Sequence, residues 1–220
     1  MGPDADATVP RWFPDDEAPT RLFLVRHGST VHSHERRFSG FNHLPLDAHG
    51  RAQAQGIARH VARSGEIDIV VSSPLPRARE TAEAIAAQVD AAVETVDDLV
   101  EMEFGDWEGL TLAEAHAKWP DIIAEWLAGR DVAPPGGESF GEVEARVLPA
   151  IDGIVARHRG KRIVVVSHIT PIKTVLRTCL SAPQETMFKF HLDTASLSVI
   201  DYYEDGTTSV RTINNSEHPA

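Results

Sequence analysis

Short apolar runs that alternate with longer segments of helical period are the feature that most constrains the fold of this chain. Each run is long enough for a buried strand and too short for a helix. Strands are predicted at residues 22–25, 67–71, 93–97 and 162–167. Helical segments are predicted at residues 47–63, 75–89, 111–128, 139–158 and 171–180. Such alternation is typical of α/β proteins, in which helices cover both faces of a largely parallel sheet.

Two details refine this pattern. Asp47 is expected to cap the first long helix, with Ala52, Ile57 and Val61 on one shared face. Near the end of the chain, residues 196–203 and 209–213 flank Glu204-Asp205-Gly206, a turn signal that predicts a hairpin. A hairpin adds antiparallel strands. We therefore expect a three-layer α/β sandwich with a mixed, mostly parallel central sheet and helices on both faces.

Length and composition favour one domain. The chain has 220 residues, of which 42% are hydrophobic, and this suits a single substantial core. Residues 1–20 are rich in Pro, Asp and Ala and show no period, so we interpret them as a flexible N-terminal arm or linker stub in which Trp12 and Phe13 could anchor part. Residues 21–215 are expected to form the domain. Pro134-Pro135-Gly136-Gly137 indicates a loop rather than a domain boundary.

Charge and cysteine content exclude several classes of function. A formal net charge of −12 argues against nucleic acid and anionic membranes as partners, so an anionic substrate must meet a local basic pocket. A single cysteine, Cys179, excludes an internal disulfide and a Cys-rich metal site. The first twenty residues lack the basic and apolar regions of a secretory signal. A cytoplasmic location is therefore expected.

The first candidate for chemistry is Arg26-His27-Gly28, which directly follows an apolar strand. A neutral imidazole is a competent nucleophile toward phosphorus, and a guanidinium holds phosphoryl oxygens in a forked geometry. The glycine permits close approach of the backbone. Taken alone the tripeptide is weak evidence, because a satisfied surface histidine is the commoner explanation.

Other segments bring matching residues to the same place. Arg77 lies on the first turn of the helix that follows the second strand, and His168 ends another apolar strand. Because parallel strands deliver their carboxyl ends to one crevice, these side chains are expected to converge on His27. Glu101 lies in a loop with several carboxylates, one of which could donate a proton.

In this order, the segments LVRHGST, SSPLPRARETA, EMEFGDWEG, PPGGES and VVVSH resemble the signature set of the histidine phosphatase superfamily, the phosphoglycerate mutase-like proteins, over residues 21–200. The resemblance implies that His27 is transiently phosphorylated and that Glu101 protonates the leaving oxygen. It further implies that Arg26, Arg77 and His168 bind the phosphoryl group, in an α/β fold that uses no metal or other cofactor. The expected substrate-binding positions are Arg26, Ser33, Ser39, Gly40, Arg77 and Ile169.

Two positions depart from the commoner pattern of the superfamily. Ser33 stands where many relatives have asparagine, and Ile169 stands where they have glycine. Serine offers one hydroxyl donor, whereas the backbone N–H of residue 169 could still face a phosphate. The segments SHITPIK and HLDTASLS resemble the acid phosphatase domain that follows a ribonuclease H domain in some actinobacterial proteins, and through it the alpha-ribazole phosphatases. No ribonuclease H module is visible.

The favoured function is a phosphomonoester hydrolase acting on a small phosphorylated metabolite. A phosphoglycerate mutase and a phosphate-binding module without turnover are the alternatives. The short gap between Glu101 and Pro134 favours a hydrolase over a mutase, and retention of all five central residues argues against the binding module. The edge of the terminal hairpin could pair in a homodimer. The leaving group stays open.

Other conspicuous residues have ordinary explanations. The histidines lack a matched carboxylate framework for a metal and are read as solvated loop residues, namely His32, His34, His43 and His49. The aromatic residues are read as core, namely Phe104, Trp107, Trp119 and Trp126. Arg36 and Arg37 could equally steer phosphate or be solvated. Arg79 is expected to be exposed or paired with a helix carboxylate, and Lys173 and Arg177 to line one helix face.

Overall fold

A mixed sheet lies at the centre of the protein, whose computed structural model describes residues 18–217. Within this range the sheet has six strands in the order β3-β2-β4-β1-β5-β6. Their bounds are β1 Thr20–Arg26, β2 Ile69–Ser72, β3 Val93–Thr95, β4 Arg162–Ser167, β5 Leu197–Tyr202 and β6 Thr208–Asn215. Strands β1 to β4 are parallel, while β5 and β6 form an antiparallel hairpin beside β1. The predicted mixed, mostly parallel sheet is confirmed.

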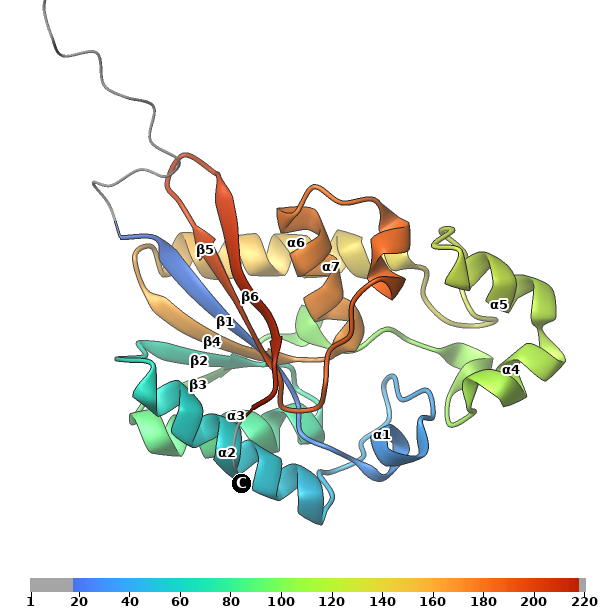
Figure 1. Cartoon of the computed structure of the whole chain (residues 1–220), viewed down its shortest axis with the longest axis horizontal. Coiled ribbons are helices and arrows are strands. Elements are labelled where there is room, and N and C mark those ends of the chain that lie inside the picture. Colours follow the sequence, from blue (N-terminus) through green and yellow to red (C-terminus); the bar gives the residue numbers. More distant parts are fainter. Residues whose placement is uncertain (1–17, 218–220) are drawn as a thin grey trace, which may run out of the picture.

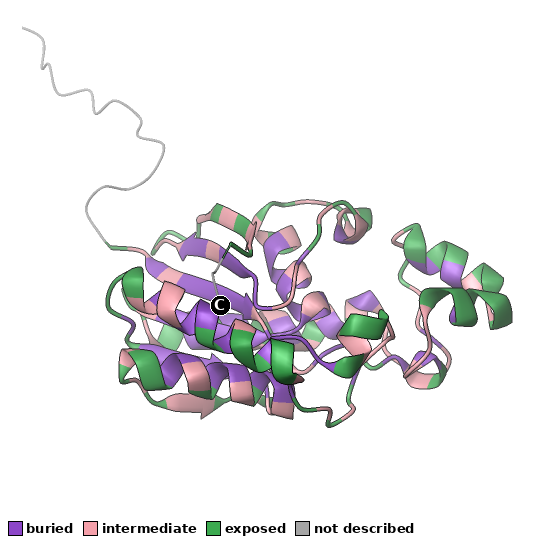
Figure 2. Ribbon diagram, turned by 60° about the horizontal axis from the view of Figure 1, so that its bottom comes forward, coloured by how far each residue is buried: buried purple, intermediate pink, exposed green. Residues whose placement is uncertain are grey.

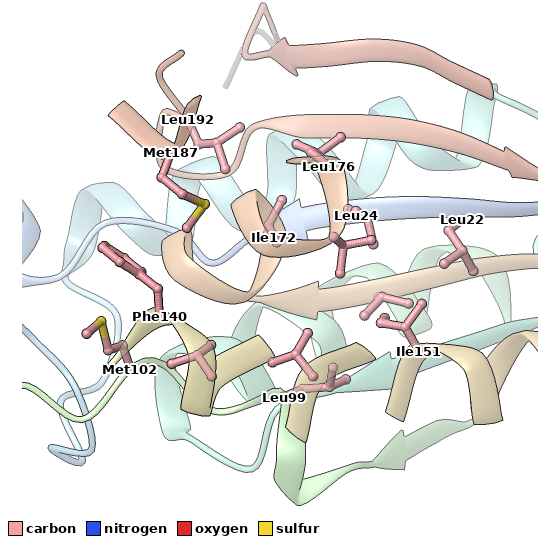
Figure 3. Close-up of a cluster of buried hydrophobic side chains, with 14 of the residues drawn as sticks. Leu22, Leu24, Leu99, Met102, Phe140, Ile151, Ile172, Leu176, Met187 and Leu192 are labelled. Atoms are coloured by element: carbon pink, nitrogen blue, oxygen red, sulfur yellow. The ribbon is translucent and has the colours of Figure 1, made fainter. Parts of the chain in front are cut away.

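Helices cover both faces of the sheet, as predicted (Figure 1). Helices α2 (Ala48–Arg63) and α3 (Pro76–Val89) pack on one face, and α6 (Phe140–Arg157) and α7 (Ile169–Cys179) pack on the other. The alternation of side chains along β1 explains this arrangement, since Phe23 and Val25 belong to the cluster with α2 and α3. Leu22 and Leu24 face the opposite cluster, with Ile151 of α6 and Ile172 of α7 (Figure 3).

Helices α4 (Leu112–Lys118) and α5 (Pro120–Leu127) stand beyond one end of the sheet, and much of their surface is exposed (Figure 2). Pro120 ends α4 and starts α5, because proline disfavours a helical conformation at the residue before it. The aromatic residues of this region pack in the core, with Trp107 fully buried and Trp126 stacked on Phe140. The interpretation as core residues is confirmed for Phe104, Trp107 and Trp126, whereas Trp119 is only partly buried and packs against the core.

Several predicted boundaries shift by a few residues. Asp47 caps α2 by accepting the Gly50 N–H, as expected, but Ala52 is exposed rather than on the buried face. Ala52 lies ~140° around the helix from Ile57, whereas the residues spaced by three and four form the buried face. That face consists of Ala54, Ile57, Ala58 and Val61. The strand predicted at 93–97 ends at Thr95, because Asp97–Leu99 turns into a 3₁₀ helix.

The part of the chain predicted as an arm is only partly described. Residues 1–17, including Trp12 and Phe13, lie outside the described residues, and Thr20 already belongs to β1. No helix within residues 18–217 is long and apolar enough to cross a membrane.

Candidate active site

A loop of residues 27–30 begins where β1 ends. The backbone N–H of His27 donates to the Ser167 carbonyl at 3.1 Å and so ties this loop to the end of β4. The loop also presses on the first turn of α2, since a Cβ on Gly28 would lie 2.5 Å from the Gly50 carbonyl oxygen. Ser29 donates to the Asp47 carboxylate at 2.9 Å. The glycine at position 28 therefore serves close packing that holds His27 in place.

His27 is oriented and kept neutral by its surroundings. The side chain is 6% exposed, and Nδ1 lies 2.7 Å from the Gly28 carbonyl oxygen. Because a carbonyl only accepts, Nδ1 carries the proton in this tautomer and Nε2 keeps its lone pair. Burial, together with the positive charges of Arg77 and Arg26, lowers the pKa of His27 well below its usual value. A neutral imidazole is the form that a nucleophile requires.

Both site arginines are held by neutral oxygen atoms. Arg26 donates to the Leu192 carbonyl at 2.7 Å, and the fully buried Arg77 donates to the Gly40 and Asn42 carbonyls at 2.7 and 2.8 Å. Burial lowers the pKa of Arg26 to about 10, which leaves it charged at neutral pH. The Nε atoms of Arg26 and Arg77 are buried and have no hydrogen-bond partner.

His168 lies beside His27, as its position after β4 predicted. It precedes the first residue of α7 and is fully buried, and its ring centroid lies 5.0 Å from that of His27. Nε2 lies 2.8 Å from the Ser73 hydroxyl, whereas Nδ1 is buried without a partner. Burial and the charge of Arg77 lower the pKa of His168 well below its usual value. His168 thus adds a third unsatisfied nitrogen to those of the arginines.

Glu101 brings a carboxylate to this group of nitrogen donors. Its side chain is 5% exposed, and Oε1 accepts from the backbone N–H groups of Met102 at 2.8 Å and Thr170 at 3.1 Å. Arg146 of α6 fixes the backbone here by donating to the Glu101 carbonyl at 2.9 Å. Burial lowers the pKa values of Arg26 and Arg77, whereas the negative charge of Glu101 raises them. The carboxylate therefore lies near both arginines. The five central residues are therefore brought together.

The remaining predicted binding positions lie around this centre, in supporting contacts. Thr30 is the N-cap of the short helix α1 (Val31–Glu35), and Ser33 completes the capping box by accepting the Thr30 backbone N–H at 2.6 Å. The Ser39 carbonyl accepts from Arg77 at 3.2 Å, and the Gly40 N–H donates to Glu108 at 2.8 Å. Ile169 is the first residue of α7 and is partly buried. Contact of these four residues with a substrate stays a prediction.

Sequence reasoning missed several residues that build the site. Asn42 and Glu108 bond each other and support the loop that Arg77 grips, and Ser73 contacts His168. Ser73 could have been found from its place in the SSPLPRARETA segment, since it follows β2 directly. Arg146 lies on a helix far along the chain, and nothing in its local sequence signals a role at Glu101.

The conspicuous residues outside the site have structural partners. Arg37 bonds Glu35 and Glu114, and Arg79 bonds Glu83 four residues later, as expected for Arg79. Arg177 pairs with Glu144 of α6. Among residues 18–217, no group of three or more His, Cys, Asp or Glu side chains is placed to hold a metal ion.

Comparison with known proteins gives matches over nearly the whole chain. A "bifunctional protein" of Mycobacterium tuberculosis is 45% identical over 209 residues, which are 95% of this chain and 57% of that protein. This chain thus corresponds to part of a longer relative. Phosphoserine phosphatase 1 of Hydrogenobacter thermophilus is 31% identical over 84% of this chain and 87% of its own. The solved mycobacterial glucosyl-3-phosphoglycerate phosphatase, in complex with VO3, superposes with a TM-score of 0.80 at 28% identity, covering 89% of this chain and 98% of its own.

The family model for the histidine phosphatase superfamily (branch 1) matches residues 22–216. This range includes all five central residues. The resemblance seen in the motifs is confirmed by the fold, by the converging side chains and by this match. The chain belongs to the histidine phosphatase superfamily.

Proposed function

We propose that the protein is a phosphomonoester hydrolase that works through a phosphohistidine on His27. One observation carries the proposal: three buried nitrogen atoms without partners belong to the residues beside His27, namely Arg26 Nε, Arg77 Nε and His168 Nδ1. A buried donor without an acceptor is costly to a folded protein. A phosphoryl group offers several oxygen acceptors and the negative charge that two guanidinium groups would stabilise. The site is therefore suited to a phosphate ester.

The chemistry follows from the roles available to the side chains. In the first step, the Nε2 lone pair of His27 attacks phosphorus, and the leaving oxygen takes a proton from Glu101 as its bond to phosphorus breaks. In the second step, the Glu101 carboxylate takes a proton from water, whose oxygen attacks phosphorus and displaces His27. Arg26 and Arg77 stabilise the charge on the transferring group in both steps. Glu101 thus serves first as acid and then as base.

The proposed substrate is a small phosphorylated metabolite. Two of the similar proteins are named as phosphatases, for phosphoserine and for glucosyl-3-phosphoglycerate, and both names support a hydrolase rather than a mutase. The cytoplasmic location and the homodimer expected from the sequence stay predictions.

The first test measures phosphate release from a panel of phosphomonoesters in the presence of EDTA. The panel includes alpha-ribazole phosphate, phosphoserine and 3-phosphoglycerate. Replacing the nucleophile, His27→Ala, should lower turnover at least ~1000-fold, because no other group can carry the phosphoryl intermediate. Acid-labile, base-stable labelling from a radioactive phosphoester should also disappear. His34→Ala, at an exposed position of α1, is the matched control and should keep full activity.

Each of the other outcomes would indicate a different function. Conversion of phosphoglycerate to its isomer without phosphate release would indicate a mutase. Tight binding of phosphoesters by a folded protein without turnover would indicate a binding module. Turnover that survives in His27→Ala would contradict the proposed nucleophile.

A further inference from the structure

Lys173 is a further cation near the site; it ends the segment SHITPIK, and the resemblance assigns it no role. It lies on α7 three residues after Thr170, whose backbone N–H donates to Glu101 at 3.1 Å. The Lys173 side chain is partly buried, and Nζ donates to the Met187 carbonyl at 2.7 Å. The segment that Lys173 contacts also reaches Arg26, because Leu192, two residues after Phe190, accepts a hydrogen bond from Arg26 at 2.7 Å. Lys173 is therefore anchored to the segment that also holds Arg26.

Neutral groups surround the ammonium. Its Nζ lies 5.1 Å from the centre of the Phe190 ring, and its hydrogen-bond acceptor is a carbonyl. No described residue forms an ion pair with Lys173. An ammonium has three N–H donors, of which the Met187 carbonyl takes one. The remaining N–H donors and the positive charge of Lys173 are therefore available to a ligand.

The charges of Arg26 and Glu101 both act on Lys173. Burial and the charge of Arg26 lower the pKa of Lys173 and the charge of Glu101 raises it, with a net lowering to about 8. Lys173 is therefore close enough to feel both residues. An anion that approached Nζ would offset the burial of the ammonium and its repulsion from Arg26.

The side of the site on which Lys173 lies indicates which part of a substrate it would meet. In the proposed reaction Glu101 protonates the leaving oxygen, so the groups around Glu101 face the leaving alcohol. The oxygens of the transferring phosphoryl group are already served by Arg26, Arg77 and His168. A group bound at Lys173 would therefore belong to the leaving alcohol.

We propose that Lys173 is a specificity-determining residue that binds a carboxylate carried by the leaving alcohol. The preferred substrates are then phosphorylated hydroxy acids rather than esters of neutral alcohols. Met187 and Phe190 flank the ammonium and limit the room around it, which favours a small acid. This inference rests on the proposed hydrolase function.

The test uses two substrates that differ only at the relevant group. In 3-phosphoglycerate a carboxylate stands where glycerol 3-phosphate has a hydroxymethyl group. Lys173→Met should lower kcat/KM for 3-phosphoglycerate about tenfold or more, mainly by raising KM, because one charge-assisted contact is lost. The value for glycerol 3-phosphate should change less than about twofold. Lys173→Arg should retain most of the preference, since it keeps the charge.

Lys189→Met is the matched control, because Lys189 lies near Met187 in the chain but is exposed. It should leave both substrates unaffected. An equal fall for both substrates in Lys173→Met would assign the lysine a structural role only and overturn the inference. So would a wild-type enzyme that hydrolyses glycerol 3-phosphate as efficiently as 3-phosphoglycerate. A wild-type protein that hydrolyses neither of these, nor p-nitrophenyl phosphate, would overturn the proposed hydrolase function itself.

Discussion

An arginine side chain forms buried contacts at each end of β1, but the two arginines bind different kinds of partner. At the amino end, Arg21 binds both carboxylate oxygens of the fully buried Asp201, at 2.6 and 2.8 Å, and Arg211 binds the same carboxylate at 2.7 Å. At the carboxyl end, Arg26 donates to a carbonyl alone. One cluster is complete without a ligand, while the other keeps positive charge and unpaired donors.

This difference separates a structural arginine from a functional one. A carboxylate that neutralises a guanidinium removes most of the field that an incoming anion could feel. Carbonyl oxygens hold a guanidinium in position but leave its net charge intact. In a chain with a formal charge of −12, a cationic pocket can persist only where the cations form no direct ion pair. Arg77, which is fully buried and bonded to carbonyls, follows the same rule.

The largest expected effect concerns the site at the carboxyl end of β1. Arg77→Met should lower kcat/KM about 1000-fold, because it removes both the proposed phosphoryl contact and the anchor of the loop at Gly40 and Asn42. Arg79→Met, two residues along the same helix, removes an exposed pair with Glu83 and should stay within about twofold. Initial rates on p-nitrophenyl phosphate measure both. Similar losses of kcat/KM in the two variants would show that Arg77 contributes no more to catalysis than the exposed Arg79.

The cluster of Arg21, Arg211 and Asp201 at the amino end of β1 should matter for stability and not for catalysis. Asp201→Asn leaves Arg21 and Arg211 without their shared carboxylate, so the free energy of unfolding should fall by about 3 kcal/mol. At a temperature where the variant is folded, its kcat/KM should match that of the wild type. Urea unfolding and steady-state kinetics provide the two readouts. A tenfold loss of kcat/KM in a folded variant would show that the two ends are coupled.

The smallest effect distinguishes the ends by their response to acid. The folded-state pKa of His168 lies well below the value of about 6.5 expected in the unfolded chain, so the unfolded state takes up protons first as pH falls. Between pH 6.5 and 5.5, His168→Asn should therefore lose about 1 kcal/mol less stability than the wild type. Urea titrations at the two pH values measure the difference.

The opposite end should respond only in stronger acid. Burial alone would raise the pKa of Asp201, but its hydrogen bonds with Arg21 and Arg211 lower it on balance. Its stabilising effect is therefore present above about pH 4 and is lost as pH falls further. If Asp201→Asn, rather than His168→Asn, changed the slope between pH 6.5 and 5.5, this assignment of the acid response would be wrong.

The central residues could be predicted because their signal is local. His27 and His168 each directly follow an apolar run, and parallel strands bring such positions to one edge of a sheet. Glu101 has no such run before it and was identified from the resemblance to the superfamily. Its carboxylate is held by the neighbouring Met102 N–H and by the first turn of α7, which lies far along the chain.

Residues whose role depends on distant parts of the chain could not be predicted. Lys173 reads as one charge on an amphipathic helix, and only the segment Gln184–Phe188 with the loop after it encloses its ammonium. Helix α1 has five residues and no apolar period, so nothing indicated that Ser33 would complete its capping box. Ala52 was assigned to the wrong face of its helix, because an error of one residue moves the expected position by ~100° around the helix axis.

The position of β1 between β4 and β5 also has a consequence for protein synthesis. Both neighbours of β1 come from the last third of the chain, so the first strand to leave the ribosome has no partners until much of the rest has followed. Contacts this distant in sequence form late and slow folding. His27 is thus made early but can meet His168 only when the domain is almost fully synthesised. A nascent chain interrupted before β4 should have no phosphate site at all.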